Sequence, residues 1–274
     1  VPLPKPKLPI FSSPPVIEVY CRIMFDPLED FQSTHLGMFR ETIKAEYPSF
    51  EEKPFLLPKT EYYKPNLGKS AEPVVIKANS LPRLWFVSEN KNQILQLQSD
   101  QLINNWKKVQ DEDSYPHYDE IIQKFENHFN EFNAFVNDHE IGEIKPKQYE
   151  LTYVNHISSL NGWEKDSPIE NIFPEFKLAS DPKNFLPKCE AFNWTNTYLL
   201  PNEEGRLYST IKVVLHRVSA EPLIRFQLKV TGINKEASLD KMRSWFDLAH
   251  EWILLSFAEL TNEKVQTEYW GRTQ

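Results

Sequence analysis

The chain has 274 residues, of which 40% are hydrophobic and 26% charged, so it can form a core and is not disordered throughout. Its formal net charge of −8 argues against broad coating by nucleic acid, because affinity for phosphates depends on positive surface. No apolar run reaches the roughly 18 residues that a membrane helix needs, so no membrane partner is expected.

The N-terminal part of the chain begins with a proline-rich arm. Residues 1–15 contain six prolines, which favour an extended polyproline II conformation lying on the body of the protein. Residues 16–158 then show alternating and helical patterns in the order β-α-β-β-α-β, which is typical of a ferredoxin-like half. In chain order, the elements predicted there are strand 16–25, helix 28–46, strands 83–88 and 93–98 as a hairpin, helix 118–137 and strand 148–157.

The C-terminal part of the chain differs from the N-terminal part in its predicted secondary structure. Residues 159–189 read as an irregular connector, and residues 190–274 read as an antiparallel meander followed by a long helix. The elements predicted there are strands 191–200, 206–218 and 223–231 and helix 238–260. The sequence therefore predicts an α+β protein whose antiparallel sheet comes in two portions, with both halves packed into one compact body.

A basic and partly aromatic surface is expected on the meander. Between Arg206 and Lys235 there are six basic residues and one acidic residue, whereas the chain as a whole is acidic. Such asymmetry is typical either of an anion-facing or partner-facing surface or of an ordinary solvated face. Alternation along the strands places one set of side chains on the outer face, which is the leading candidate for a binding site: Tyr208, Lys212, His216, Arg225 and Lys229.

The rival hypothesis is an enzyme of an unrecognised class with a polar pocket near strand 148–157, formed with the long 47–82 loop. Its candidate residues are Asn105, Glu150, Asn155 and His156. Alternation places Glu150 and His156 on one face of the strand and Asn155 on the other. Six residues along a strand at ~3.3 Å each separate Glu150 from His156 by about 20 Å, which excludes direct acid–base cooperation between them.

No cofactor or metal is expected. The seven glycines are never fewer than twenty positions apart, whereas loops that wrap phosphates need clustered glycines. Neither His139-Glu140 nor His250-Glu251 is followed by the second histidine of an H-E-x-x-H zinc site. Two cysteines, Cys21 and Cys189, are too few for a disulfide scaffold, so a reduced, soluble, cytoplasmic protein is predicted.

Several short stretches carry a resemblance along nearly the whole chain. They are residues 14–19 (PPVIEV), 97–100 (LQSD), 105–106 (NW), 115–118 (YPHY), 149–157 (YELTYVNHI) and 268–271 (EYWG). In this order they resemble a sporadically distributed family of uncharacterised prokaryotic proteins, a resemblance that implies no particular activity. A patchy distribution is typical of mobile or defence-linked genes, which favours a partner-binding role in a toxin–antitoxin or antiphage setting.

The function expected from the sequence is therefore that of a non-catalytic binding protein. Its partner would be a protein or an anionic ligand held by the outer face of residues 206–232, with nucleic acid as the less favoured partner. Catalysis by the polar residues near strand 148–157 is the alternative.

Overall fold

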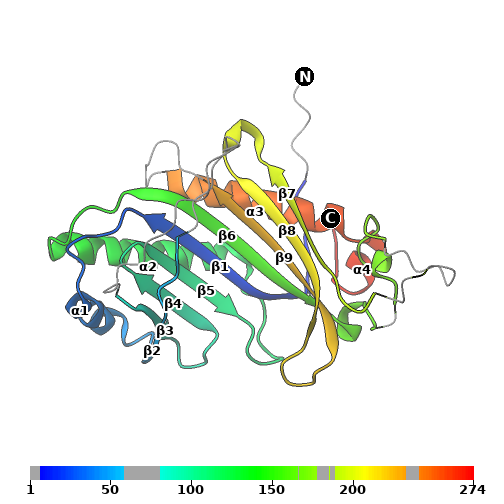
Figure 1. The fold of residues 1–274 in the computed structure, drawn as a ribbon, viewed down its shortest axis with the longest axis horizontal. Coiled ribbons are helices and arrows are strands. Elements are labelled where there is room, and N and C mark those ends of the chain that lie inside the picture. Colours follow the sequence, from blue (N-terminus) through cyan, green and yellow to red (C-terminus); the bar gives the residue numbers. More distant parts are fainter. Residues whose placement is uncertain (1–6, 59–80, 166, 178–184, 186–188, 233–240) are drawn as a thin grey trace.

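The computed structural model describes residues 7–58, 81–165, 167–177, 185, 189–232 and 241–274 (Figure 1). Within these residues, nine strands form one antiparallel sheet in the order β2-β3-β4-β5-β1-β6-β9-β8-β7. The strands are β1 (Val16–Phe25), β2 (Ser49–Lys53), β3 (Arg83–Val87), β4 (Gln93–Gln98), β5 (Gln101–Lys107), β6 (Pro146–Ile157), β7 (Asn193–Leu199), β8 (Arg206–Leu215) and β9 (Pro222–Gly232). The predicted α+β class is confirmed.

The predicted division of the sheet into two portions is not confirmed. β6 pairs with β1 on one side and with β9 on the other, so the sheet runs continuously from β2 to β7. Two strands, β2 and β5, were missing from the sequence prediction, and the N-terminal order is β-α-β-β-β-β-α-β rather than the ferredoxin-like one. β5 escaped prediction because both of its faces are buried and its buried side chains include amides, which removes the apolar–polar alternation.

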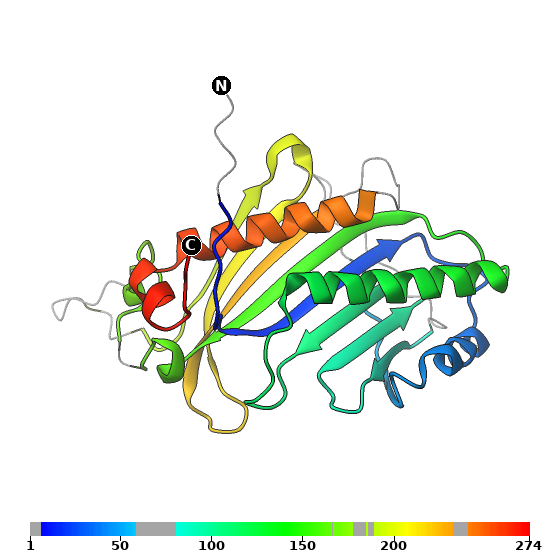
Figure 2. The ribbon, with the colours of Figure 1, turned by 180° about the vertical axis from the view of Figure 1, so that it is seen from behind.

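Four α-helices are seen among the described residues: α1 (Ser33–Ile43), α2 (His117–Asp138), α3 (Met242–Leu260) and α4 (Glu263–Glu268). Figure 2 shows α2 and α3 lying side by side on one face of the sheet, with α1 beside α2. The aromatic stripe of α2 meets that of α3, for example where the rings of Phe125 and Phe246 lie 5.0 Å apart. The hydrophobic core therefore lies between this helical layer and the sheet. None of the helices that the structure describes covers the opposite face, which we call the helix-free face.

The predicted limits of one helix need correction, since α1 spans Ser33–Ile43 and not residues 28–46. α1 begins at Ser33 instead of residue 28, because the backbone N–H of Leu28 donates to the carbonyl of Ser99 and Gln32 and His35 form a capping box. Leu28 is buried all the same. In the C-terminal helix, residues 238–240 lie outside the described part, and α3 is seen from Met242 onward. β8 ends at Leu215, so His216 lies in the turn that follows it.

The described part of the proline-rich arm packs against the C-terminus. The backbone N–H of Ser12 donates to the carbonyl of Gly271, and Phe11 forms an isolated antiparallel bridge with Arg272. The ring of Phe11 is buried edge-on against Phe257, with 5.2 Å between the ring centroids. The arm therefore covers the end of α3. None of the helices in the described ranges is both long and apolar enough to cross a bilayer.

Candidate ligand-binding face of the sheet

The helix-free face of the sheet is turned toward the viewer in Figure 1, and buried polar side chains such as Arg22, Glu150 and Thr152 lie at its centre. In β1, Val19, Cys21 and Ile23 are fully buried in the core, whereas Tyr20 and Arg22 alternate with them and point to the other face. β6 repeats the pattern, since its odd-numbered residues from 149 to 153 join the core. Adjacent strands thus align their polar positions into rows across the helix-free face.

A buried carboxylate on this face lies between two cations, one in the same row and one in the next row. Glu150 lies directly opposite Arg22 in the β1–β6 register, with 3.7 Å between Arg22 Nη1 and Glu150 Oε2. On its other side, Lys229 Nζ lies 3.9 Å from the same oxygen. The exposed fractions of Arg22 and Glu150 are only 7% and 6%. Burial lowers the pKa of Arg22, and the charge of Glu150 opposes that shift.

Arg22 retains unused hydrogen-bonding capacity. Its Nε and Nη2 atoms are buried and have no hydrogen-bond partner within the described structure. A buried donor without an acceptor costs about 1–3 kcal/mol, and more when it belongs to a charged group. The arginine therefore offers two further donors for an acceptor on this face.

A second row is positively charged across three strands. Arg225 of β9 lies opposite Lys212 of β8 on one side and opposite His156 of β6 on the other. In the described part of the chain, neither Arg225 nor Lys212 has a carboxylate within ion-pair distance. Burial lowers the pKa of His156 to about 4, and the nearby charges of Arg225 and His216 add to that shift. The row therefore carries a local excess of positive charge.

The remaining residues of the expected binding surface lie close to this row. Lys229 Nζ sits 4.8 Å above the ring of Tyr208, in a cation–π contact, and is partly neutralised by Glu150. His216 lies in the turn after β8, where its Nδ1 is 3.1 Å from the hydroxyl of Ser219. Four of the five predicted binding residues thus lie on one face of β8 and β9, whereas His216 lies in the turn beyond β8. Among the described residues, Arg225 and Lys212 are the two cations of this set that have no ion-pair partner.

The four catalytic candidates do not converge. Asn155 points to the helical side, where its Nδ2 donates to the carbonyl of Phe226. Asn105 is on the helix-free face but donates to Glu18 at 2.8 Å and accepts from Gln96 at 2.6 Å, so both ends of its amide are occupied. In the described chain, no group of three or more His, Cys, Asp or Glu side chains is arranged to hold a metal ion.

Sequence reasoning missed Arg22 as a member of the site. Alternation in strand 16–25 placed it on the polar side, which is the local signal that was present. Its burial and its pairing with Glu150 depend on β1 lying beside β6, a contact between residues more than a hundred positions apart. No local pattern reports such a pairing.

Comparison with known proteins assigns neither a family nor a function to the chain. No family model matches it, and no curated protein matches it significantly.

Proposed function

We propose that this protein is a non-catalytic binding protein that receives an acidic segment of a partner protein on the outer face of β8 and β9. The observation that carries the proposal is the direct cross-strand pair of Lys212 and Arg225, which lacks a carboxylate partner among the described residues. The free cysteines, Cys21 and Cys189, support a reducing, cytoplasmic setting.

The energetic argument rests on like charges. Two cations directly opposite each other on neighbouring strands destabilise the sheet, typically by a few tenths of a kcal/mol up to about 1 kcal/mol. The chain has 39 acidic residues against 31 basic ones, so counter-ions are abundant in its composition. Lys212 and Arg225 nevertheless have no acidic partner among the described residues. An anion that binds between them and offsets their repulsion would explain this arrangement.

The choice of a protein partner rests on the neighbouring edge. β7 is the last strand of the sheet, next to β8, and it exposes 39% of Tyr198 and 52% of Leu199. An extended polypeptide can pair with a free strand edge and use such apolar side chains at the same time. A phosphate backbone would use the cations alone.

The test uses a fluorescent oligoglutamate peptide whose binding is followed by anisotropy at low and high salt. We expect saturable, salt-sensitive binding that falls at least about fivefold in a Lys212→Gln/Arg225→Gln variant, since two charge contacts are lost. The matched control is Lys108→Gln, because Lys108 is exposed and lies on another part of the chain.

Two outcomes would overturn the proposal. One is a peptide affinity that is the same in the double variant and the wild type. The other is tighter binding of a single-stranded oligonucleotide of equal charge, which would identify the surface as a nucleic-acid site.

A further inference from the structure

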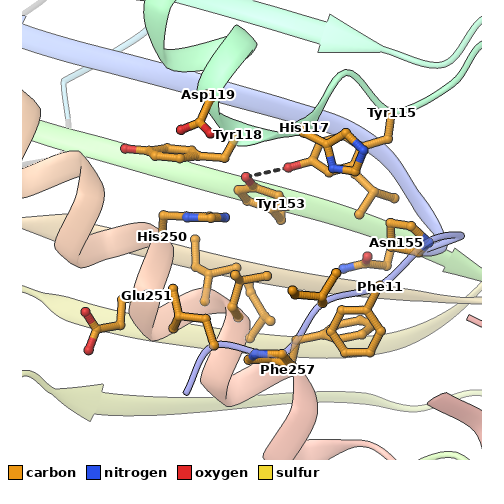
Figure 3. A pocket seen from close by; sticks show the side chains of 18 of the residues that line it. Phe11, Tyr115, His117, Tyr118, Asp119, Tyr153, Asn155, His250, Glu251 and Phe257 are labelled. Atoms are coloured by element: carbon orange, nitrogen blue, oxygen red, sulfur yellow. Dashed lines mark hydrogen bonds between the residues drawn. The ribbon is translucent and has the colours of Figure 1, made fainter. Parts of the chain in front are cut away.

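A second candidate site lies on the opposite side of the sheet. A cavity of about 600 Å³ opens between the start of α2, the middle of α3, β6 and the N-terminal arm (Figure 3). Its volume lies within the range of about 300–1,000 Å³ that is usual for small-molecule sites. Side chains from four distant segments form its walls: Phe11, Tyr115, Tyr118, Tyr153, His250 and Phe257.

A buried acceptor without a partner faces this cavity. Asn155 is 1% exposed, and its Nδ2 is bound to the carbonyl of Phe226 at 3.1 Å. Its Oδ1 is buried and has no hydrogen-bond partner within the described structure. Figure 3 shows the amide directed into the cavity. Because an orphaned buried acceptor is destabilising, the site favours a ligand that brings a donor to this oxygen.

The upper wall is a set of aromatic rings. The hydroxyls of Tyr115 and Tyr153 form a hydrogen bond of 2.9 Å. The planes of their rings lie at 70° to each other, with 6.1 Å between the centroids. The imidazole of His250 stacks on Tyr118 at 3.9 Å. Aromatic rings with a face open to a cavity attract cations, which is how aromatic cages recognise organic ammonium ions.

The charges around the cavity point the same way. Three carboxylates line it, those of Asp119, Asp247 and Glu251, and none of its described lining residues is lysine or arginine. Arg243 lies outside the lining and pairs with Asp119, Glu126 and Asp247, so three acids share one guanidinium beside the cavity. Burial lowers the pKa of His250 to about 4, so its ring adds no positive charge at neutral pH.

We infer that this cavity binds a small organic ammonium ion with an aromatic body. The aromatic ring system of the ligand fills the space lined by Phe11 and Phe257. Its ammonium group is held by the tyrosine rings, by Asn155 Oδ1 and by the negative potential of the carboxylates that line the cavity. This site is independent of the proposed docking of an acidic segment, since it lies across the sheet and takes a ligand of opposite charge.

The experiment titrates the full chain with tryptamine and tyramine by calorimetry, and with the carboxylates that carry the same rings, indole-3-acetate and 4-hydroxyphenylacetate. We expect saturable binding of the amines and affinities for the carboxylates at least about tenfold lower, a difference of about 1.4 kcal/mol. Failure of every amine to saturate, or equal affinity for amines and carboxylates, overturns the inference.

Two sets of variants locate the ligand. Leu254→Trp fills the cavity from α3 and should abolish amine binding, whereas Leu255→Trp, on the same helix but outside the lining, should not. Asp247→Asn with Glu251→Gln keeps the shape of the cavity and should weaken the amines about two- to fivefold while leaving the binding of neutral indole unchanged. Unaltered amine binding in both Leu254→Trp and the charge variant would place the ligand elsewhere and overturn the assignment.

Discussion

The imidazole of His250 lies flat against the phenol ring of Tyr118, with 3.9 Å between the ring centroids and 9° between the ring planes. This contact joins α3 to the first turn of α2, and the hydroxyl of Tyr118 donates to Asp247 beside it. The two helices are thereby fixed to each other at one wall of the cavity. The stack also shields His250 from much of the surrounding water, with a consequence for the stability of the fold.

The first prediction concerns pH. Burial lowers the pKa of His250 from 6.5 to about 4, so below pH 6.5 the unfolded chain takes up a proton that the folded protein does not. The free energy of unfolding should therefore fall as the pH drops from 6.5 to 4, by at most about 3 kcal/mol from this residue. Urea unfolding of the wild type and of His250→Phe, which keeps a stacking ring, measures the effect.

Carboxylates elsewhere in the chain titrate in both proteins, so their contribution cancels when the wild type is compared with His250→Phe. The difference in unfolding free energy between wild type and His250→Phe should shift in favour of the variant as the pH falls. A difference that stays constant from pH 6.5 to 4 would mean that His250 is not held neutral by the fold.

The second prediction concerns the buried carboxylate at the centre of the sheet. Glu150→Gln leaves Arg22 and Lys229 without their shared anion, so we expect a loss of about 2–4 kcal/mol in the free energy of unfolding. Glu29→Gln, at an exposed position, should change it by less than about 0.5 kcal/mol. Adding Arg22→Met to Glu150→Gln should restore part of the loss, and equal stability of the single and double variants would contradict this account.

The strand faces of the candidate site could be predicted from the sequence, but the partners across strands could not. Alternation separates Glu150 and His156 from Asn155, and the structure places them on opposite faces. The cluster around Glu150 needs β1 beside β6, and the cavity combines the arm, α2, β6 and α3. These contacts join residues far apart in the chain, whereas a periodic pattern carries only local information.

The fold shows the same limit. Helix α2, with its regular aromatic stripe, was predicted at 118–137 and is found at His117–Asp138. The edge strand β2 was not predicted, because its sequence SFEEK is mostly exposed and has no buried stripe. Its place in the sheet depends on pairing with β3 across the intervening segment.

The third prediction separates stability from binding on the outer face. Lys212→Glu converts the repulsive pair with Arg225 into an attractive one, so the free energy of unfolding should rise by about 0.5–1 kcal/mol. The same change should abolish the binding of an acidic peptide. Lys108→Glu provides the comparison for a change of two charge units at an exposed site. A destabilised Lys212→Glu variant would show that the two cations do not oppose each other in the folded protein.

The fourth prediction compares two glycines. At Gly37, on the exposed face of α1, an added Cβ meets nothing within 4 Å. Gly37→Ala should therefore raise the free energy of unfolding by about 0.5–1 kcal/mol, because alanine restricts the unfolded chain and favours a helix. At Gly232, the end of β9, a Cβ would collide with the carbonyl oxygen of Glu204 and lie 2.5 Å from Trp245 Nε1.

At Gly232, a hydrogen bond fills the space that a side chain would need. Trp245 Nε1 donates to the carbonyl of Glu204 at 2.9 Å, which ties α3 to the turn before β8 directly over Gly232. Gly232→Ala must displace this bond or the backbone, so we expect a loss of about 1–3 kcal/mol in the free energy of unfolding. Thermal and urea unfolding of both variants, measured together, should give changes of opposite sign. Equal effects would contradict the close packing of α3 against the end of β9.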